Sequence, residues 1–374
     1  MRSQNVILWI ILLIAIGGIC LALVVFLLSN KPLGPSLDLP TITSTTTSFS
    51  SISSTPVEQA SSSNLVATST PQPNSGELVT SVPTPTATKQ PLCNGPATMT
   101  ILAIGSDQRG TSYLYGLADS IHVVRIDFSI PNIMVIDFPR DLWVEIPGIA
   151  DHYGITHGKL NQAYLFGNPG MGYYDGPGEG PGLLARTLDL NFGLRVDHYV
   201  AIDTQTFVRM IDAVGGVDIT IDYPIDLNYG NDKPDSKLFI PVGTHHLDGE
   251  LALALATNRV PTTFRRMEYQ KIILSALRKK LLTPEMIPQI PQLVVRFITS
   301  VQTDLSPSDI NSLICIAQAV PNESILADSF PQEMFKASDI YDPYRNVTTF
   351  IYDVDFNQLR AMIAEFMNGI WPMP

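Results

Sequence analysis

The sequence predicts a mixed α/β domain with a central β-sheet flanked by helices. Three runs rich in β-branched residues, 98–105, 120–128 and 132–138, are each bounded by Gly, Pro, Ser or Asn, which is typical of strands. After them, segments of helical periodicity alternate with further strand-like runs, as in domains whose helices pack on a sheet. We therefore expect one folded domain built around a mixed sheet.

The first three runs are expected to form an antiparallel meander. The joint between the second and third, 129–132, is short enough for a hairpin. In a meander, the end of the first strand, the start of the second and the end of the third lie at one edge of the sheet. The charged residues at those positions are Asp107, Arg109, Asp119, Arg140 and Asp141. The sequence therefore predicts a charged cluster at one rim of the sheet.

The rest of the domain alternates helices and strands. Helices are expected at 180–193, 204–216, 247–258 and 264–282, and strands at 196–203 and 217–225. Thr204 stands at an N-cap position and Gly215 at a helix stop. From Pro284 the chain is punctuated by prolines. Three further helices are expected around 291–302, 307–318 and 355–368. We place the domain at 97–283 and a C-terminal helical extension, packed on its core, at 284–374.

Residues 6–28 form an uncharged apolar run long enough to cross a bilayer as a helix. Arg2 precedes this run and Lys31 follows it, so the charge bias of the flanks is weak. A cleaved signal peptide is the alternative, but the run is longer than a typical signal core and no A-x-A site follows. We expect a cytoplasmic tail at 1–5, an uncleaved single-pass anchor in the cell membrane, and the main domain outside.

A disordered linker rich in Ser, Thr and Pro is expected at 29–96. Residues 41–92 hold only three charged side chains, and a segment of this composition has too little apolar surface to form a core. The linker would therefore tether the folded domain to the membrane.

Charge, histidine and cysteine content narrow the function further. The formal net charge of −12 at pH 7 argues against a nucleic-acid partner. The adjacent residues His245 and His246 belong to no HExxH pattern, so a histidine metal site is not expected. Cys93 and Cys315 would both lie outside the membrane, where the sequence is compatible with a disulfide or with two free thiols.

Asp107 and Asp119 converge in the meander and would offer two carboxylates to Mg²⁺. This cation is usually held by one or two carboxylates together with substrate phosphates and water. The alternative role is structural, with Asp107 capping the turn 105–110 and Asp119 capping the start of a strand.

Arg259, Arg265 and Arg266 form a basic island in an acidic chain. Arg266 and Gln270 are four residues apart and so share a helix face, and guanidinium groups suit phosphate oxygens. The alternative is a solvated, salt-bridged surface. Taken with the aspartates, these residues fit a substrate that carries a pyrophosphate, and the expected anchor favours a lipid. The apolar run 250–256 would then line a slot for the lipid tail or pack as a buried helix.

The chain resembles the LytR-CpsA-Psr family from Thr98 to Leu282. The motifs that carry this resemblance, in order, are 101–110, 118–127, 137–148, 158–164, 196–219, 246–254 and 265–274. The resemblance implies an α/β domain outside the membrane that transfers teichoic acid or capsular glycopolymers from a polyprenyl-pyrophosphate carrier to peptidoglycan, with Mg²⁺ as cofactor.

The resemblance also implies roles for single residues. Asp107 and Asp119 would bind the metal, and Asp119 is the candidate general base. Arg140 belongs to a Pro-Arg-Asp motif that contacts the pyrophosphate, and Asp141 would orient it. The residues implied to act in catalysis are Asp119, Arg140 and Asp141. The residues implied to hold the substrate are Arg109, Arg140, Arg259, Arg266 and Gln270.

Several positions depart from the family pattern. Leu117, Thr257 and Tyr269 stand where arginines are usual, and Thr263 stands where an aspartate is usual. Arg265, one position from a usual arginine, is a candidate substitute. The loss matters because one well-placed charged contact contributes about a hundredfold or more in rate.

The leading prediction is a membrane-anchored glycopolymer phosphotransferase. Three alternatives remain open at this point. One is a protein of the same fold that binds polyprenyl phosphates without transfer, and another is a lipid pyrophosphate hydrolase that uses water as acceptor. The last is an adhesive surface protein on a Ser/Thr stalk.

Overall fold

The computed structural model describes residues 30–39, 90–108, 112–228, 235, 238–258 and 262–371. All of them belong to one compact unit. The predicted membrane helix at 6–28, most of the predicted linker, and the predicted site residues Arg109 and Arg259 lie outside the described residues. Within the described ranges, no helix is long and apolar enough to span a bilayer.

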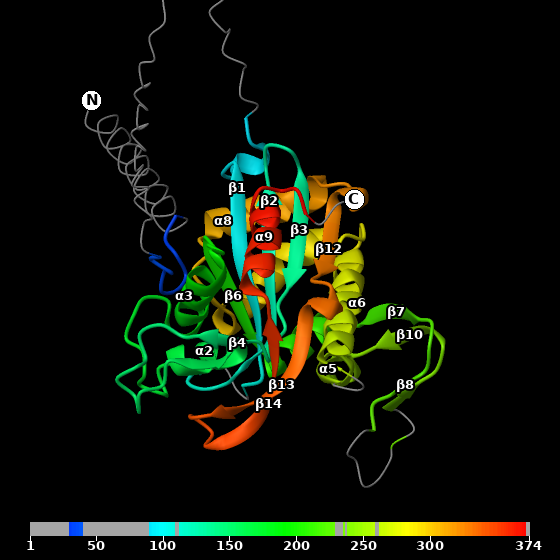
Figure 1. The fold of residues 1–374 in the computed structure, drawn as a ribbon. Coiled ribbons are helices and arrows are strands. Elements are labelled where there is room, and N and C mark those ends of the chain that lie inside the picture. Colours follow the sequence, from blue (N-terminus) through cyan, green and yellow to red (C-terminus); the bar gives the residue numbers. More distant parts are fainter. Residues whose placement is uncertain are drawn as a thin grey trace, which may run out of the picture. The chain divides into compact units, whose positions relative to one another are not determined.

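A six-stranded sheet forms the centre of the fold, in the order β11–β6–β1–β2–β3–β12 (Figure 1). Its strands are β1 (Thr98–Ser106), β2 (Ala118–Asp127), β3 (Asn132–Asp137), β6 (His198–Asp203), β11 (Gln302–Thr303) and β12 (Ile325–Ser329). β2 is antiparallel to both β1 and β3, which confirms the predicted meander. β6 is parallel to β1 and β12 is parallel to β3, so the sheet is mixed, as predicted.

Helices cover both faces of this sheet. They are α2 (Leu160–Gly167), α3 (Glu179–Phe192), α4 (Thr204–Ala213), α5 (Gly249–Thr257), α6 (Thr263–Leu281), α7 (Ile290–Phe297), α8 (Pro307–Ala319) and α9 (Phe356–Met367). On one face, Leu102 and Ile104 share a core with α2, α3 and α9. On the other face, Met99 and Ile101 pack against α8. The alternation along β1 thus supplies apolar side chains to two separate cores.

The smaller sheets are two-stranded. They pair β4 (Trp143–Glu145) with β5 (His157–Lys159), β7 (Val217–Ile221) with β10 (Gly243–Leu247), β8 (Ile225–Asp226) with β9 (Phe239–Ile240), and β13 (Phe335–Asp342) with β14 (Val347–Val354). Buried residues of β7 and β10 form a further core with α4, α5 and α6. The predicted strand at 217–225 therefore lies beside the central sheet and is not part of it.

The segment after residue 283 is not only helical, which corrects the predicted helical extension. β11 and β12 are strands of the central sheet, and β13 and β14 form a hairpin. β11 has two residues, and no side chain of β12 is fully buried. Neither strand shows the apolar alternation by which a strand is recognised in a sequence.

Residues 30–39 also correct a prediction, because they lie on the folded domain and not in a free linker. Leu37 is 3% exposed and belongs to the main core. The Leu33 N–H donates to the Leu305 carbonyl at 3.2 Å, and the Tyr199 hydroxyl donates to the Pro35 carbonyl at 2.9 Å. The average composition of segment 29–96 did not reveal that one apolar residue, Leu37, packs into the core.

Two local features settle further details. Asp203, and not Thr204, caps α4, because its carboxylate accepts a hydrogen bond from the Thr206 N–H at 2.7 Å. Cys93 and Cys315 form a disulfide, with a Cα–Cα distance of 5.7 Å, so of the two possibilities for these cysteines the bonded one holds. The bond joins the short helix η1 (Leu92–Asn94) to α8.

Candidate functional site

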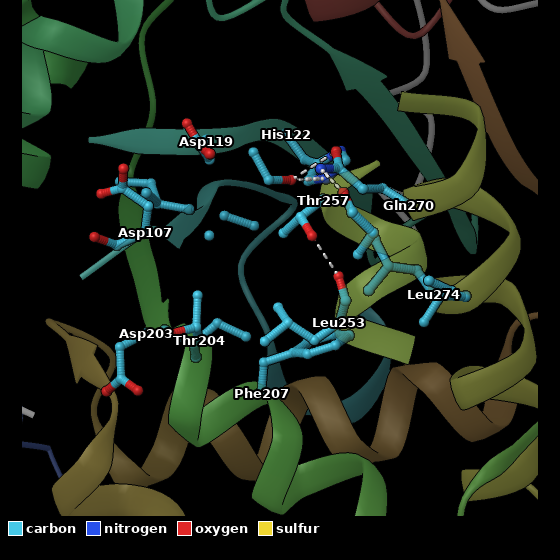
Figure 2. A pocket seen from close by; sticks show the side chains of 18 of the residues that line it. Asp107, Asp119, His122, Asp203, Thr204, Phe207, Leu253, Thr257, Gln270 and Leu274 are labelled. Atoms are coloured by element: carbon cyan, nitrogen blue, oxygen red, sulfur yellow. Dashed lines mark hydrogen bonds between the residues drawn. The ribbon is translucent and has the colours of Figure 1, made fainter. Parts of the chain in front are cut away.

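The predicted charged rim begins where β1 ends beside the start of β2. Gly105 pairs with Ser120 and Ser106 pairs with Ala118, so Asp119 lies at a register irregularity between these two pairs. The Asp107 N–H donates to the Leu117 carbonyl at 3.1 Å, and the Leu117 N–H donates to Asp107 Oδ1 at 2.7 Å. Both aspartates line one pocket, on the same side of it (Figure 2).

Arg140 comes three residues after the end of β3 and completes this rim. Its Nη1 donates to Asp119 Oδ1, and its Nε donates to Asp141 Oδ2 at 3.3 Å. Burial lowers the pKa of Arg140, but the charges of Asp119 and Asp141 raise it by more, so the pKa lies above its ordinary value. The described members of the predicted charged cluster therefore lie at this rim, and Arg140 is a fixed cation within it, while Arg109 lies outside the described residues.

Asp141 is 5% exposed and connects the rim to two other elements. It accepts from Lys159 Nζ at 3.0 Å and from Thr263 Oγ1 at 3.3 Å, in addition to Arg140. Burial raises the pKa of Asp141, but Arg140 and Lys159, followed by Arg266, lower it by more, and the pKa lies below its ordinary value. Asp141 is thus ionised and orients the Arg140 guanidinium, as the sequence suggested.

α6 places Arg266 near Asp141 of the rim and Gln270 in the wall of the pocket. Arg266 is 2% exposed and Gln270 is 9% exposed. The Gln270 amide Nε2 donates to the Ala256 carbonyl at 3.0 Å, and its Oε1 accepts from the Ser120 hydroxyl at 3.1 Å. Gln270 therefore links α5, α6 and β2 at the pocket.

A largely apolar pocket with a cavity volume of about 200 Å³ lies behind the charged rim. Residues of the sheet form one wall and α4, α5 and α6 form the opposite wall (Figure 2). The apolar residues that line it include Ala103, Val200, Ile202, Phe207, Leu253, Ala256, Ile273 and Leu274. The run 250–256 contributes both to a pocket and to packing, since Leu253 and Ala256 line the pocket while Ala252 and Leu255 are buried. Its role as a slot for a lipid tail stays a prediction.

A second apolar hollow with a cavity volume of about 490 Å³ adjoins this pocket. Val200 and Leu274 line both spaces. Side chains of α7 and α8 form much of its wall, so the C-terminal segment extends the apolar surface that starts at the rim.

The residues that depart from the family pattern lie in the pocket, in a core or at the rim. Thr257 lines the pocket, whereas Tyr269 is 3% exposed and belongs to the core around β7. Thr263 hydrogen-bonds Asp141, so it contributes to the rim without a charge. Leu117 contributes only its backbone, in the two hydrogen bonds with Asp107.

Arg265, the candidate substitute for a missing arginine, points to other partners. Its Nη1 donates to the Tyr223 hydroxyl at 2.8 Å and to Glu268 Oε2 at 2.6 Å, and its guanidinium lies over the Tyr223 ring. It therefore gives the site no replacement for the missing charge.

The structure adds four residues that the sequence did not single out as site residues. Lys159 pairs with Asp141. Ser120 and His122 line the pocket, and Asp137 contacts the His122 ring. A histidine between the apolar residues Ile121 and Val123 was the available signal for His122. Nothing in the sequence linked Lys159 to Asp141, because the sequence does not show that β5 pairs with β4.

Asp107 and Asp119 suit Mg²⁺ by their chemistry, as two carboxylates that line the same pocket. In the part of the chain that the structure describes, no group of three or more His, Cys, Asp or Glu side chains is placed to hold a metal ion. A cation here would take its remaining ligands from substrate oxygens and water, and magnesium stays a prediction.

An α/β domain with a charged rim on a long apolar pocket defines a protein that can hold an amphiphile with an anionic head group. The LytR_cpsA_psr family model matches residues 60–365, and the chain belongs to this family.

Curated relatives are similar over part of their length. Regulatory protein MsrR of Staphylococcus aureus is 29% identical over 227 residues, which is 58% of this chain and 61% of MsrR. The polyisoprenyl-teichoic acid–peptidoglycan teichoic acid transferase TagV of Bacillus subtilis is 30% identical over 209 residues, 55% of this chain and 49% of TagV. The chain thus spans less than two thirds of these relatives.

Solved structures share the fold. The crystal structure of B. subtilis TagV matches with a TM-score of 0.56 and 25% identity, covering 72% of this chain and 97% of TagV. The TagT structure with bound octaprenyl pyrophosphate matches with a TM-score of 0.52 and 20% identity, covering 75% of this chain and 96% of TagT.

Proposed function

We propose that this protein is a phosphotransferase that moves a glycopolymer from a polyprenyl-pyrophosphate carrier to peptidoglycan. The observation that carries the proposal is the junction of the Asp119–Arg140 rim with an apolar pocket. This junction suits a molecule with a pyrophosphate head and a prenyl tail. The name of TagV as a teichoic acid transferase and the octaprenyl pyrophosphate bound by TagT support the same substrate class.

Arg140 would hold the pyrophosphate, because a buried guanidinium is a strong donor to phosphate oxygens. Asp141 fixes its Nε side, which leaves Nη1 directed to Asp119. Phosphate oxygens would replace Asp119 as the partner of Nη1. Asp119 would then be released to act as general base, which makes substrate binding a condition for catalysis.

The reaction would form one bond and break one. The oxygen of the acceptor hydroxyl bonds to the sugar-proximal phosphorus, and the bond from that phosphorus to the bridging oxygen breaks. The hydroxyl proton passes to Asp119, and the polyprenyl monophosphate leaves with the electron pair of the broken bond. Mg²⁺ bound by Asp107 and Asp119 would offset the negative charge of the pyrophosphate. Arg266 and Gln270 would position the head group.

We further propose that residues 6–28 anchor the protein in the cell membrane, with the folded domain outside. The Cys93–Cys315 disulfide supports this location, because disulfides persist in oxidising compartments and are rare in the cytosol.

The test uses the full chain in detergent micelles, with a glycopolymer on an octaprenyl-pyrophosphate carrier and peptidoglycan as acceptor. Release of octaprenyl phosphate and label on peptidoglycan are followed together. Arg140→Ala should lower the transfer rate by about a hundredfold or more. Arg265→Ala is the matched control, because Arg265 is bonded outside the rim, and it should transfer at nearly the wild-type rate. No transfer by the wild-type chain would refute the proposal.

A second candidate is a protein that binds polyprenyl phosphates without transfer. It is favoured by Tyr269, which lies in a core where a family arginine would serve the substrate, and by Arg265, which does not replace it. Binding of octaprenyl pyrophosphate that depends on Arg140, with no bond cleaved, would establish this candidate. Cleavage that needs no peptidoglycan would instead indicate a hydrolase.

A further inference from the structure

Ser120, His122 and Asp137 form a hydrogen-bonded chain at the wall of the pocket. Ser120 and His122 lie two residues apart on one face of β2, and Asp137 is paired opposite His122 on β3. Ser120 Oγ lies 2.5 Å from His122 Nε2, and His122 Nδ1 contacts Asp137 Oδ1. The second oxygen of Asp137 accepts from the Ser329 hydroxyl at 3.1 Å. His122 is 6% exposed and Asp137 is 1% exposed, so the chain is buried apart from its Ser120 end.

The direction of each hydrogen bond follows from the far end of the chain. The Ala256 carbonyl can only accept, so the Gln270 amide turns its NH₂ there and its oxygen to Ser120. The Ser120 hydroxyl then donates its one proton to Gln270. Its oxygen must therefore accept from His122 Nε2–H, while Nδ1–H donates to Asp137. Both ring nitrogens carry protons, and His122 is an imidazolium with Asp137 as its counter-ion.

This cation lies beside the rim where the head group is proposed to bind. Ser120, His122 and Gln270 line the same pocket as Asp119, and Figure 2 shows His122 and Gln270 together on the side away from Asp107. The chain thus ends in a hydroxyl that faces the pocket and is polarised by a buried positive charge. Such a hydroxyl can redirect its proton from Gln270 to a phosphate oxygen.

We propose that Asp137, His122 and Ser120 are a proton relay that protonates the lipid phosphate as it leaves, an inference that rests on the proposed transfer reaction. As the bond to the bridging oxygen breaks, Ser120 passes its proton to that oxygen and takes the Nε2 proton of His122. Neutral His122 regains a proton from solvent, and the acceptor's proton leaves through Asp119. The sum is one proton moved from the acceptor hydroxyl to the polyprenyl phosphate. Ser120 is the catalytic residue, and His122 and Asp137 act through it.

Other charged groups surround this relay and belong in any account of its pH dependence. Asp137 contacts the ring from β3. The carboxylates that line the same pocket are Asp107, Asp119 and Asp203. On the elements that flank this hydrogen-bonded chain, Lys271 Nζ of α6 lies 4.0 Å from Asp328 Oδ1 of β12. All of these charged residues are unchanged in the variants below, except that Asp137→Asn removes the carboxylate of Asp137.

The first test is the rate of octaprenyl phosphate release by the full chain at neutral pH. His122→Met should lower this rate by about a hundredfold, since general acids contribute about that much or more. Asp137→Asn should lower it by a smaller factor, because the ring keeps Ser120 as a partner and loses the carboxylate that orients it. Unchanged rates in both variants would overturn the relay.

Matched variants separate the relay from a structural role. Ser120→Ala should lower the rate about as much as His122→Met, whereas Ser120→Thr keeps a hydroxyl and should retain most of it. His246→Gln is the control, because His246 forms an exposed pair with Asp218 and does not line the pocket. It should leave the rate unchanged. Equal loss in Ser120→Ala and Ser120→Thr would show that the hydroxyl has no role.

A measurement without turnover tests the relay even if the proposed transfer fails. The ¹⁵N spectrum of the histidine rings, with His122 assigned by difference from His122→Met, shows how many ring nitrogens are protonated. Two protonated nitrogens at neutral pH are expected for His122, and the signal should shift when octaprenyl pyrophosphate is added. A neutral His122 ring would overturn the inference, whereas a wild-type chain with an imidazolium and no transfer would refute only the proposed function.

Discussion

The two faces of the central sheet are built from the same strands but differ in the size of the side chains they present. Under α2, α3 and α9, the central strands present large apolar residues that are at most 3% exposed, namely Leu102, Ile104, Ile121 and Val123. Under α5 and α6, they present small or polar residues that line the pocket, namely Ala103, Gly105, Ser120 and His122. Because successive side chains alternate between faces, one strand builds a core on one side and a binding site on the other.

The comparison teaches that small size alone does not mark the pocket face, because an alanine also occurs on the packed face. Ala103 and Ala201 are both alanines on adjacent strands, but Ala201 is fully buried in the main core while Ala103 lines the pocket. At Gly105, an added Cβ would lie 3.0 Å from the Ser120 Cβ, so even a methyl group would crowd the relay there. The binding face is therefore kept open by the absence of side-chain volume.

The largest effect should come from removing volume on the packed face. Leu102 is 0% exposed in the main core, so Leu102→Ala should lower the free energy of unfolding by about 2–5 kcal/mol. Leu274→Ala is the control on the open face, because Leu274 is 43% exposed and should cost less than about 1 kcal/mol. Urea unfolding of the full chain measures both. Equal losses would mean that the open face is packed as tightly as the other.

Adding side-chain volume should have a smaller effect on stability than removing it, and this effect should again differ between the two faces of the sheet. Ala201→Leu should lower the free energy of unfolding by about 1–3 kcal/mol, because an already filled core has no room for it. Ala103→Leu should change stability by less than about 1 kcal/mol but weaken octaprenyl pyrophosphate binding about tenfold or more. Urea unfolding and lipid titration of the two variants test this together. Unchanged lipid affinity in Ala103→Leu would show that the tail lies elsewhere.

The elements that sequence could predict are those whose signal is local. The meander follows from three apolar runs and a short joint, and it places Asp107, Asp119 and Arg140 at one rim without any knowledge of the fold. The shared helix face of Arg266 and Gln270 follows from the same kind of argument. The ion pair between Arg140 and Asp119 was not predicted and is a finding of the structure.

The elements that sequence could not predict depend on long-range contact. Asp137 is one residue of a strand, and its role appears only when β2 sets it opposite His122. Lys159 reaches Asp141 because β5 pairs with β4. β11 and β12 carry too few buried side chains to be recognised, and they are strands because the edges of the sheet provide hydrogen-bond partners. Such pairings have no periodicity of their own.

Ion pairs stabilise the rim between the two faces. The contribution of the rim to the free energy of unfolding therefore depends on pH, whereas that of the apolar cores does not. Lys159→Met removes one partner of buried Asp141 but leaves Arg140 and Thr263, so it should lower the free energy of unfolding by about 1–2 kcal/mol at neutral pH. The pKa of Asp141 is lower in the folded chain than in the unfolded one, where it is ordinary. Its stabilisation is therefore fully present above the unfolded pKa of about 3.9 and is lost as the pH falls through the folded pKa.

Urea unfolding of wild type and Lys159→Met from about pH 7 down to about pH 3 should therefore show a gap that is constant at first and then narrows in acid. Lys279→Met, on the exposed C-terminal turn of α6, should show no gap at either end. A gap in Lys159→Met that does not change with pH would mean that the aliphatic stem of Lys159 stabilises the rim by packing. In that case the rim would resemble the packed face, and the contrast between a core built from volume and an edge built from charge would not hold.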